Sequence, residues 1–145
     1  MLEVSNQKST LLINGASAAT NATATANVDT RGFDSCRIAV WQSTTNAPSA
    51  LKVEHADTTD ATAFVTINAT GGTDFTLPTS TATTTNPLAV FDINTGGLKR
   101  YLRLSYTPAT ATANVVAIVE LGRPLTGIDS ATDLSAGAWV TVPAR

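Results

Sequence analysis

The stretch from Leu88 to Tyr106 constrains the fold more than any other part of the chain. Two apolar-rich runs, Leu88–Ile93 and Leu98–Tyr106, flank the sequence Asn94–Gly97. Asn and Gly tolerate the positive φ angles of a tight hairpin turn. In the second run apolar residues alternate with basic, aromatic and hydroxyl residues, which is the period of a strand with one core face. Arg100 interrupts this alternation and is expected at the sheet margin or in a bulge. The stretch therefore predicts a central β-hairpin.

Short runs with the same period recur along the chain, separated by Gly, Pro, Asn and Asp. They are Leu11–Ile13, a strand from about Thr23, Ser35–Ser43, Leu51–His55, Ala61–Ala69, Asn114–Leu121 and Trp139–Val142. Ala16–Ala26 is rich in Ala, but Thr and Asn interrupt it and no large apolar residue forms a helical stripe, so it is expected to be a loop leading into the strand. Thr73–Asn86 is expected to be a loop or lid. About eight to nine short strands without a helix predict an all-β antiparallel sandwich or barrel.

The chain has 145 residues, enough for one domain with a core that needs neither disulfides nor metal. Residues 1–10 are polar and aperiodic and are expected to form an N-terminal arm. Residues 11–145 are then a single β-sandwich domain with a C-terminal tail. The predicted core consists of apolar residues on one face of each strand: Ile38, Val40, Leu51, Val53, Val65, Ile67, Val90, Leu102, Leu104, Val115, Ala117 and Val119.

The composition excludes several function classes. Net charge is -2 and the pI is about 5.1, so the chain lacks the basic balance of a nucleic-acid-binding protein. No run approaches the roughly 18 apolar residues of a membrane span. The N-terminus lacks the basic start and apolar segment of a signal peptide, which predicts a protein made and used without Sec export. Ala and Thr make up about a third of the chain, which gives small, flat surfaces or else reflects a codon bias.

No group of residues in the sequence has the pattern of a catalytic or metal site. His55 is the sole histidine and shares a strand face with two apolar residues, so a structural or surface role is expected. Cys36 alternates with Ile38 and Val40, which predicts a buried thiol rather than a reactive one. Two acidic pairs could each contribute to a calcium site, although solvated turn carboxylates fit them better: Asp57 with Asp60, and Asp129 with Asp133. The sequence predicts no enzyme and no cofactor.

Several segments between residues 26 and 123 carry a family resemblance. Val28–Val40 contains Asp29, Gly32, Phe33 and Asp34, a spacing that resembles the start of many small phage head proteins. The segments that follow have an order similar to that of decoration, or cement, proteins of tailed bacteriophages: Leu51–His55, Val90–Ile93, Lys99–Leu104 and Val115–Arg123. The resemblance implies a jelly-roll-like β-sandwich, often trimeric, that sits on an assembled capsid and clamps neighbouring major capsid subunits. It also implies synthesis in the host cytoplasm and a final place on the virion surface.

Two sets of contact residues follow from these expectations. The candidates for a homotrimer interface are aromatic and arginine residues on strand faces, the types enriched at interface centres: Arg37, Trp41, Phe64, Tyr101 and Arg103. The alternative for Trp41 and Phe64 is a place in the sandwich core. The candidates for capsid contact lie in the arm: Leu2, Val4, Asn6 and Lys8. The alternative function is a tail-fibre or receptor-binding module that contacts host surface glycan. Neither function involves nucleic acid or a membrane.

Overall fold

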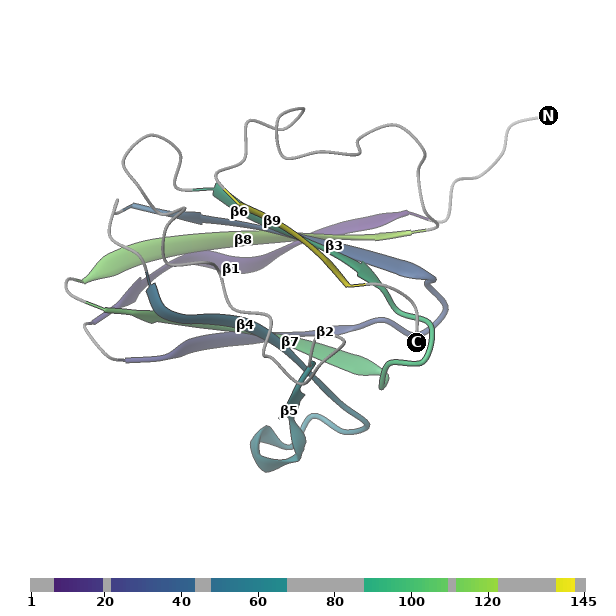
Figure 1. The fold of residues 1–145 in the computed structure, drawn as a ribbon. Coiled ribbons are helices and arrows are strands. Elements are labelled where there is room, and N and C mark those ends of the chain that lie inside the picture. Colours follow the sequence, from purple (N-terminus) through teal and green to yellow (C-terminus); the bar gives the residue numbers. More distant parts are fainter. Residues whose placement is uncertain are drawn as a thin grey trace.

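The chain folds into two facing β-sheets (Figure 1). The computed structural model describes residues 7–19, 22–43, 48–67, 88–109, 112–122 and 138–142. The strands are β1 (Lys8–Ala18), β2 (Ala24–Asp29), β3 (Ser35–Gln42), β4 (Pro48–Ala56), β5 (Val65–Thr66), β6 (Leu88–Asn94), β7 (Tyr101–Pro108), β8 (Ala113–Gly122) and β9 (Ala138–Val142), with one 3-10 turn, η1 (Ala61–Ala63). The described residues contain no α-helix. The predicted all-β sandwich is confirmed.

The strand order is that of a jelly roll. One sheet has the order β1-β8-β3-β6-β9 and the other β2-β7-β4-β5. From β1 to β4 and again from β6 to β8, successive strands alternate between the two sheets, and the strand pairs are antiparallel. The exception is β9, which is parallel to β6 at one edge of the five-stranded sheet. Eight strands therefore form the double-sheet jelly-roll arrangement, and β9 extends it.

The predicted central hairpin is wrong, although its turn is correctly placed. β6 pairs with β3 and β9, whereas β7 pairs with β2 and β4 in the other sheet. Residues 95–100 thus carry the chain from one sheet to the other. Gly97 has a φ of 78°, and the side chain of Asn94 accepts a hydrogen bond from the Gly96 N–H at 2.9 Å. Arg100 lies just before β7, at the sheet margin. Alternation identifies the buried face of a strand but not the strand beside it.

β1 is longer at both ends than predicted. It begins at Lys8, so the last residues of the predicted arm belong to the sheet, and residues 1–6 lie outside the described part of the chain. It continues past Asn14 and Gly15 to Ala18, where a loop was expected. Its register with β8 shifts between Leu11 and Ile13 and again before Ala16, and Gly15 has a φ of 60°. Asn and Gly serve β-bulges as well as turns, so this pair of residues marks a bulge inside the strand.

The expected strand Ala61–Ala69 is replaced by η1 and the two-residue β5. The Asp60 side chain accepts a hydrogen bond from the Thr62 N–H at 2.9 Å and starts the 3-10 turn. Val65 and Ile67 both follow the turn, but β5 ends at Thr66, so strand alternation does not hold their two side chains to one face. Ile67 is buried as predicted, but Val65 is 49% exposed and does not belong to the core.

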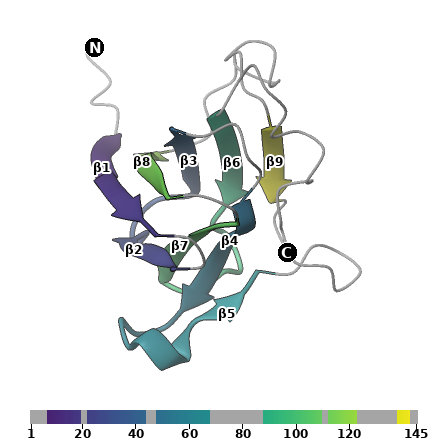
Figure 2. The same cartoon turned by 90° about the vertical axis from the view of Figure 1, so that its left-hand side faces the viewer.

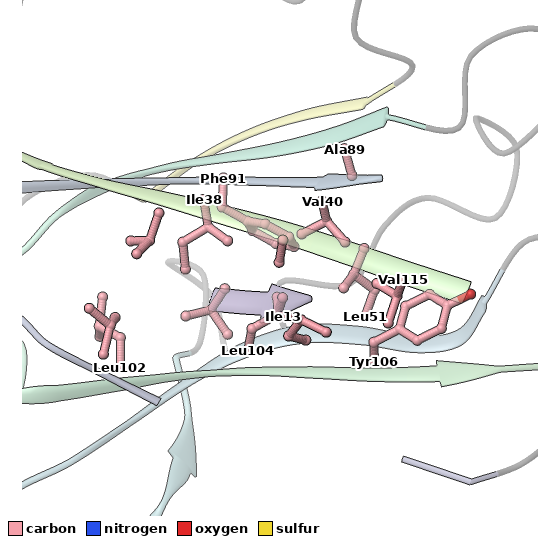
Figure 3. Packing of buried hydrophobic residues seen from close by; sticks show 14 of the residues in the cluster. Ile13, Ile38, Val40, Leu51, Ala89, Phe91, Leu102, Leu104, Tyr106 and Val115 are labelled. Carbon is pink, nitrogen blue, oxygen red and sulfur yellow. The ribbon is translucent and has the colours of Figure 1, made fainter. Parts of the chain in front are cut away.

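The core lies between the two sheets (Figure 3). Apart from Val65, the predicted core residues are buried, but Val90 is buried outside the cluster between the sheets, because it lies on the other face of its strand from Ala89 and Phe91. The largest fully buried side chains are Tyr106 and Phe91. The Tyr106 hydroxyl donates a hydrogen bond of 2.8 Å to Oε1 of Gln42, which links the two sheets at one end of the core. The predicted loop at 73–86 and the acidic pair at 129 and 133 lie outside the described residues.

Candidate protein-docking surface

The outer face of the five-stranded sheet exposes large apolar side chains in one row. On β3, Ile38 and Val40 point into the core, so Ala39 between them points outward. Ala39 pairs with Ile118 of β8, and Ile118 pairs with Leu11 of β1. Ile118 is 45% exposed and Leu11 is 49% exposed. Three neighbouring strands thus place apolar residues side by side on the surface.

A second apolar pair lies next to this row. Trp41 of β3 pairs with Val116 of β8, and Trp41 is 43% exposed. We call these five neighbours the outer apolar patch: Leu11, Ala39, Trp41, Val116 and Ile118. Single exposed apolar residues are ordinary, but a contiguous group on the outer face of a sheet marks an interaction surface.

The row extends to Val90 of β6, which pairs with Ala39 and points outward. Val90 is nevertheless buried and is not part of the core between the sheets. The exposed patch therefore lies over β1, β8 and β3.

A charged row borders the outer apolar patch. Arg37 of β3 is paired in register with Glu120 of β8 on one side and Asp92 of β6 on the other. Its guanidinium donates a hydrogen bond of 2.9 Å to the Asp92 carboxylate. An apolar centre beside a charged margin is the usual anatomy of a protein–protein interface, where the polar rim stays in contact with water.

The outer face of the four-stranded sheet has a different character, because its polar groups bind one another. Glu54 of β4 is only 5% exposed. Its carboxylate accepts hydrogen bonds from Arg103 Nε at 2.7 Å and Ser105 Oγ at 3.3 Å, and Lys52 Nζ lies 3.0 Å from it. Burial opposes the charge of Glu54, but the hydrogen bonds from Arg103 and Lys52 outweigh it and lower its pKa. The Glu54 carboxylate is thus nearly buried and charged, with hydrogen-bond and ion-pair partners for its oxygens.

Arg103 also fastens η1 and β5 to this face. Its Nη1 donates a hydrogen bond of 3.0 Å to the Ala61 carbonyl, and its guanidinium lies 4.2 Å from the centre of the Phe64 ring. Nearby, the Arg100 guanidinium donates two hydrogen bonds, of 3.0 and 2.6 Å, to the Asp29 carboxylate. The same guanidinium lies 4.8 Å from the centre of the Tyr101 ring. The bond from Arg100 lowers the pKa of Asp29 to about 2. This face is thus organised by its own ion pairs.

The structure divides the predicted interface residues between the two outer faces. Arg37 and Trp41 lie at the outer apolar patch, and the exposure of Trp41 excludes the core alternative for it. Phe64, Tyr101 and Arg103 lie on the opposite face, where Phe64 is buried beneath Arg103 and outside the core between the sheets. The five residues therefore do not form one surface.

The predicted capsid-contact residues are almost all outside the described part of the chain. Leu2, Val4 and Asn6 fall there, whereas Lys8 is exposed at the start of β1. Of the predicted arm, only residues 7–10 are described, and residues 8–10 belong to β1.

The titratable residues singled out by the sequence have structural surroundings. His55 Nδ1 accepts a hydrogen bond of 3.2 Å from the Lys99 N–H, which ties β4 to the segment before β7. Cys36 is completely buried, and burial raises the pKa of its thiol to about 12. Asp57 and Asp60 are exposed turn residues, as expected. Across the described ranges, no three His, Cys, Asp or Glu side chains gather to bind a metal ion.

Sequence reasoning missed Leu11, Val116 and Ile118 as surface residues. The signal was present in β8, whose apolar residues occupy both faces of the strand. Such a pattern is typical of an interior strand, and β8 does lie between β1 and β3. Its second face, however, points to the outside of the sandwich rather than into a core.

Comparison with known proteins finds no matching family model, no similar curated protein and no similar solved structure. In the part of the chain that the structure describes, no helix has the length and apolar character to cross a membrane.

Proposed function

We propose that this protein decorates an assembled phage head, binding its outer surface and stabilising it by bridging major capsid subunits. The observation that carries the proposal is the outer apolar patch, an uncharged group of side chains on three paired strands with a charged margin. Such a surface fits another folded protein better than a small molecule, which needs a concave pocket. The order of the segments between residues 26 and 123 supplies the choice of a capsid as the partner.

In this proposal the copies associate as a homotrimer and the N-terminal residues reach the capsid. Trp41 and Arg37 lie at the contact between copies, where an exposed aromatic ring and a guanidinium contribute most. Leu2, Val4, Asn6 and Lys8 contact the major capsid protein. Each contact is modest, but three linked copies bind together and multiply the affinity. The proposal involves no catalysis, cofactor, nucleic acid or membrane.

Co-sedimentation with purified heads tests the proposal. The expected result is binding in tens to hundreds of copies per head, read from gel density. Deleting residues 1–7, which precede β1, should reduce occupancy while the far-UV circular dichroism of the sandwich stays unchanged. Ile118→Lys should also reduce occupancy, since it places a charge in the outer apolar patch, weakens the contact between copies and so removes the advantage of linked binding.

Thr59→Lys is the matched control for Ile118→Lys, because Thr59 is exposed and lies outside the patch. No binding to heads, together with binding to host cells or their glycans, would instead identify a tail-fibre or receptor-binding module. Such a module would be present in few copies per virion.

A further inference from the structure

β2 is an edge strand that lacks the usual protection against pairing. It lies at the end of the four-stranded sheet and pairs only with β7, in continuous register from Ala24 to Asp29. Figure 2 shows β1 and β2 on the same side of the sandwich. An edge strand presents free N–H and C=O groups, which proteins normally guard with Lys, Pro, bulges or a very short strand. The sequence of β2, Ala-Thr-Ala-Asn-Val-Asp, contains none of these.

Two other edges of the sandwich are protected. β1 has two irregularities in its register and begins with Lys8. β5 has only two residues and follows directly after the 3-10 turn. By contrast, no backbone hydrogen bond joins residues 24–28 to any described segment other than β7. Among the described segments, β2 therefore keeps an edge that has no bulge and is paired on one side only.

The side chains of β2 are also compatible with a neighbouring strand. Thr25 and Asn27 are exposed, small and uncharged. The sole charge, on Asp29, lies at the end of the strand and is already paired with Arg100. A second strand can approach without burying an unpaired charge.

We propose that β2 pairs antiparallel with β2 of a second copy of this chain, so that two four-stranded sheets join into one. In an antiparallel pair, the backbone groups of two opposite residues point the same way, either toward each other or away from each other. Two identical strands can therefore pair about a two-fold axis, and the residue at the axis then lies opposite the same residue of the second copy. With Ala26 or Asn27 at the axis, Asp29 faces Thr23 or Thr25 of the second copy. A parallel pair would instead place the two Asp29 carboxylates side by side, which is destabilising. The charge pattern thus selects the antiparallel arrangement.

This contact is independent of capsid binding. Alone it produces a dimer, and combined with a three-fold contact it produces an assembly of at least six copies. Both differ in mass from a simple trimer. The mass in solution therefore tests the edge contact, whereas co-sedimentation with heads tests the proposed function, so the failure of one is distinguishable from the failure of the other.

Disulfide trapping of the full chain tests the contact even when it is weak. For the register centred on Asn27, the variant Asn27→Cys is oxidised alone, because position 27 then faces its own copy. For the register centred on Ala26, Asn27→Cys is mixed with Thr25→Cys, because position 27 then faces position 25. Cysteines opposite each other in paired strands are close enough to bond. The native Cys36 is completely buried and does not interfere. Thr59→Cys is the control, since Thr59 is equally exposed but lies away from β2.

The expected result is trapping of Asn27→Cys, alone or with Thr25→Cys, roughly tenfold or more faster than the control, because held thiols have a high effective concentration. Adding Thr25→Asp to Asn27→Cys, or Thr23→Asp to the mixed pair, should abolish that excess with unchanged circular dichroism, because in each register the new carboxylate faces Asp29 of the second copy. Trapping no faster than Thr59→Cys in either arrangement overturns the proposal. So does trapping that the added carboxylate at position 25 or 23 leaves undiminished, or a native chain whose mass in solution is that of a trimer alone.

Discussion

Arg103→Met should destabilise the fold by about 3 kcal/mol at pH 7. The Glu54 carboxylate is nearly buried and lies 2.7 Å from Arg103 Nε. At an effective dielectric constant near 20, the Coulomb attraction at that distance is roughly 6 kcal/mol before the cost of desolvation. Removing one partner of a buried pair typically costs about 3–5 kcal/mol, because the remaining charge is stranded. Lys52 stays 3.0 Å from the carboxylate, which places the expected cost at the lower end.

The double variant Glu54→Gln/Arg103→Met supplies the decisive comparison. Removing both charges leaves no stranded carboxylate, so the double variant should be more stable than Arg103→Met alone, by about 1–2 kcal/mol. Urea unfolding followed by far-UV circular dichroism measures all three proteins. A cost below about 1 kcal/mol for Arg103→Met, or a double variant less stable than the single one, would refute the reasoning.

The pH dependence gives a second measurement of the same network. The pKa of Glu54 in the folded protein is below its ordinary value of 4.5, because the bonds from Arg103 and Lys52 outweigh burial. A lowered folded pKa means stability that is fully present above pH 4.5 and is lost as the pH falls through the folded value. In Arg103→Met the stranded carboxylate takes up a proton more readily. The difference in stability between wild type and Arg103→Met should therefore shrink below pH 4.5.

Two further predictions concern the core. Leu104→Ala should lower the free energy of unfolding in urea by about 2–5 kcal/mol, because Leu104 is completely buried. Val65→Ala should change it by less than about 0.5 kcal/mol, because Val65 is exposed. Equal costs for the two variants would contradict the assigned burial. Cys36 should resist an aromatic disulfide reagent at pH 8 in the native protein and react quickly in urea, since burial raises its pKa to about 12. Rapid reaction of the native thiol would show that the strand opens readily.

The strands and their buried faces were predictable because they depend on local alternation. Cys36, Ile38 and Val40 face the core as their spacing indicated. Pairing between strands depends on distant segments, and for this reason the stretch from Leu88 to Tyr106 was interpreted as a hairpin although its halves lie in different sheets. Asn14 and Gly15 were misinterpreted because bulges and turns use the same residue types.

The candidate site was less predictable than the fold. A strand with apolar residues on both faces can lie between two buried layers or can expose one face, and periodicity does not separate the two cases. Ile118 and Val116 therefore could not be assigned to the surface from the sequence of β8 alone. Arg103 was recognised as an outward-facing residue, but its buried partner Glu54 comes from β4, whose position beside β7 depends on the complete topology.

The pairing of β1 with β8 has a consequence for synthesis of the chain. Lys8 lies opposite Leu121, so the first strand to leave the ribosome has no neighbour in its own sheet until nearly the whole sandwich has emerged. At about 5–20 residues per second, this wait is roughly 5–20 s. During that time the apolar side chains of β1 are without their native cover. A nascent chain stalled before Ala113 should therefore remain unfolded and sensitive to protease, and release of β8 should join β1 to β3 in the five-stranded sheet.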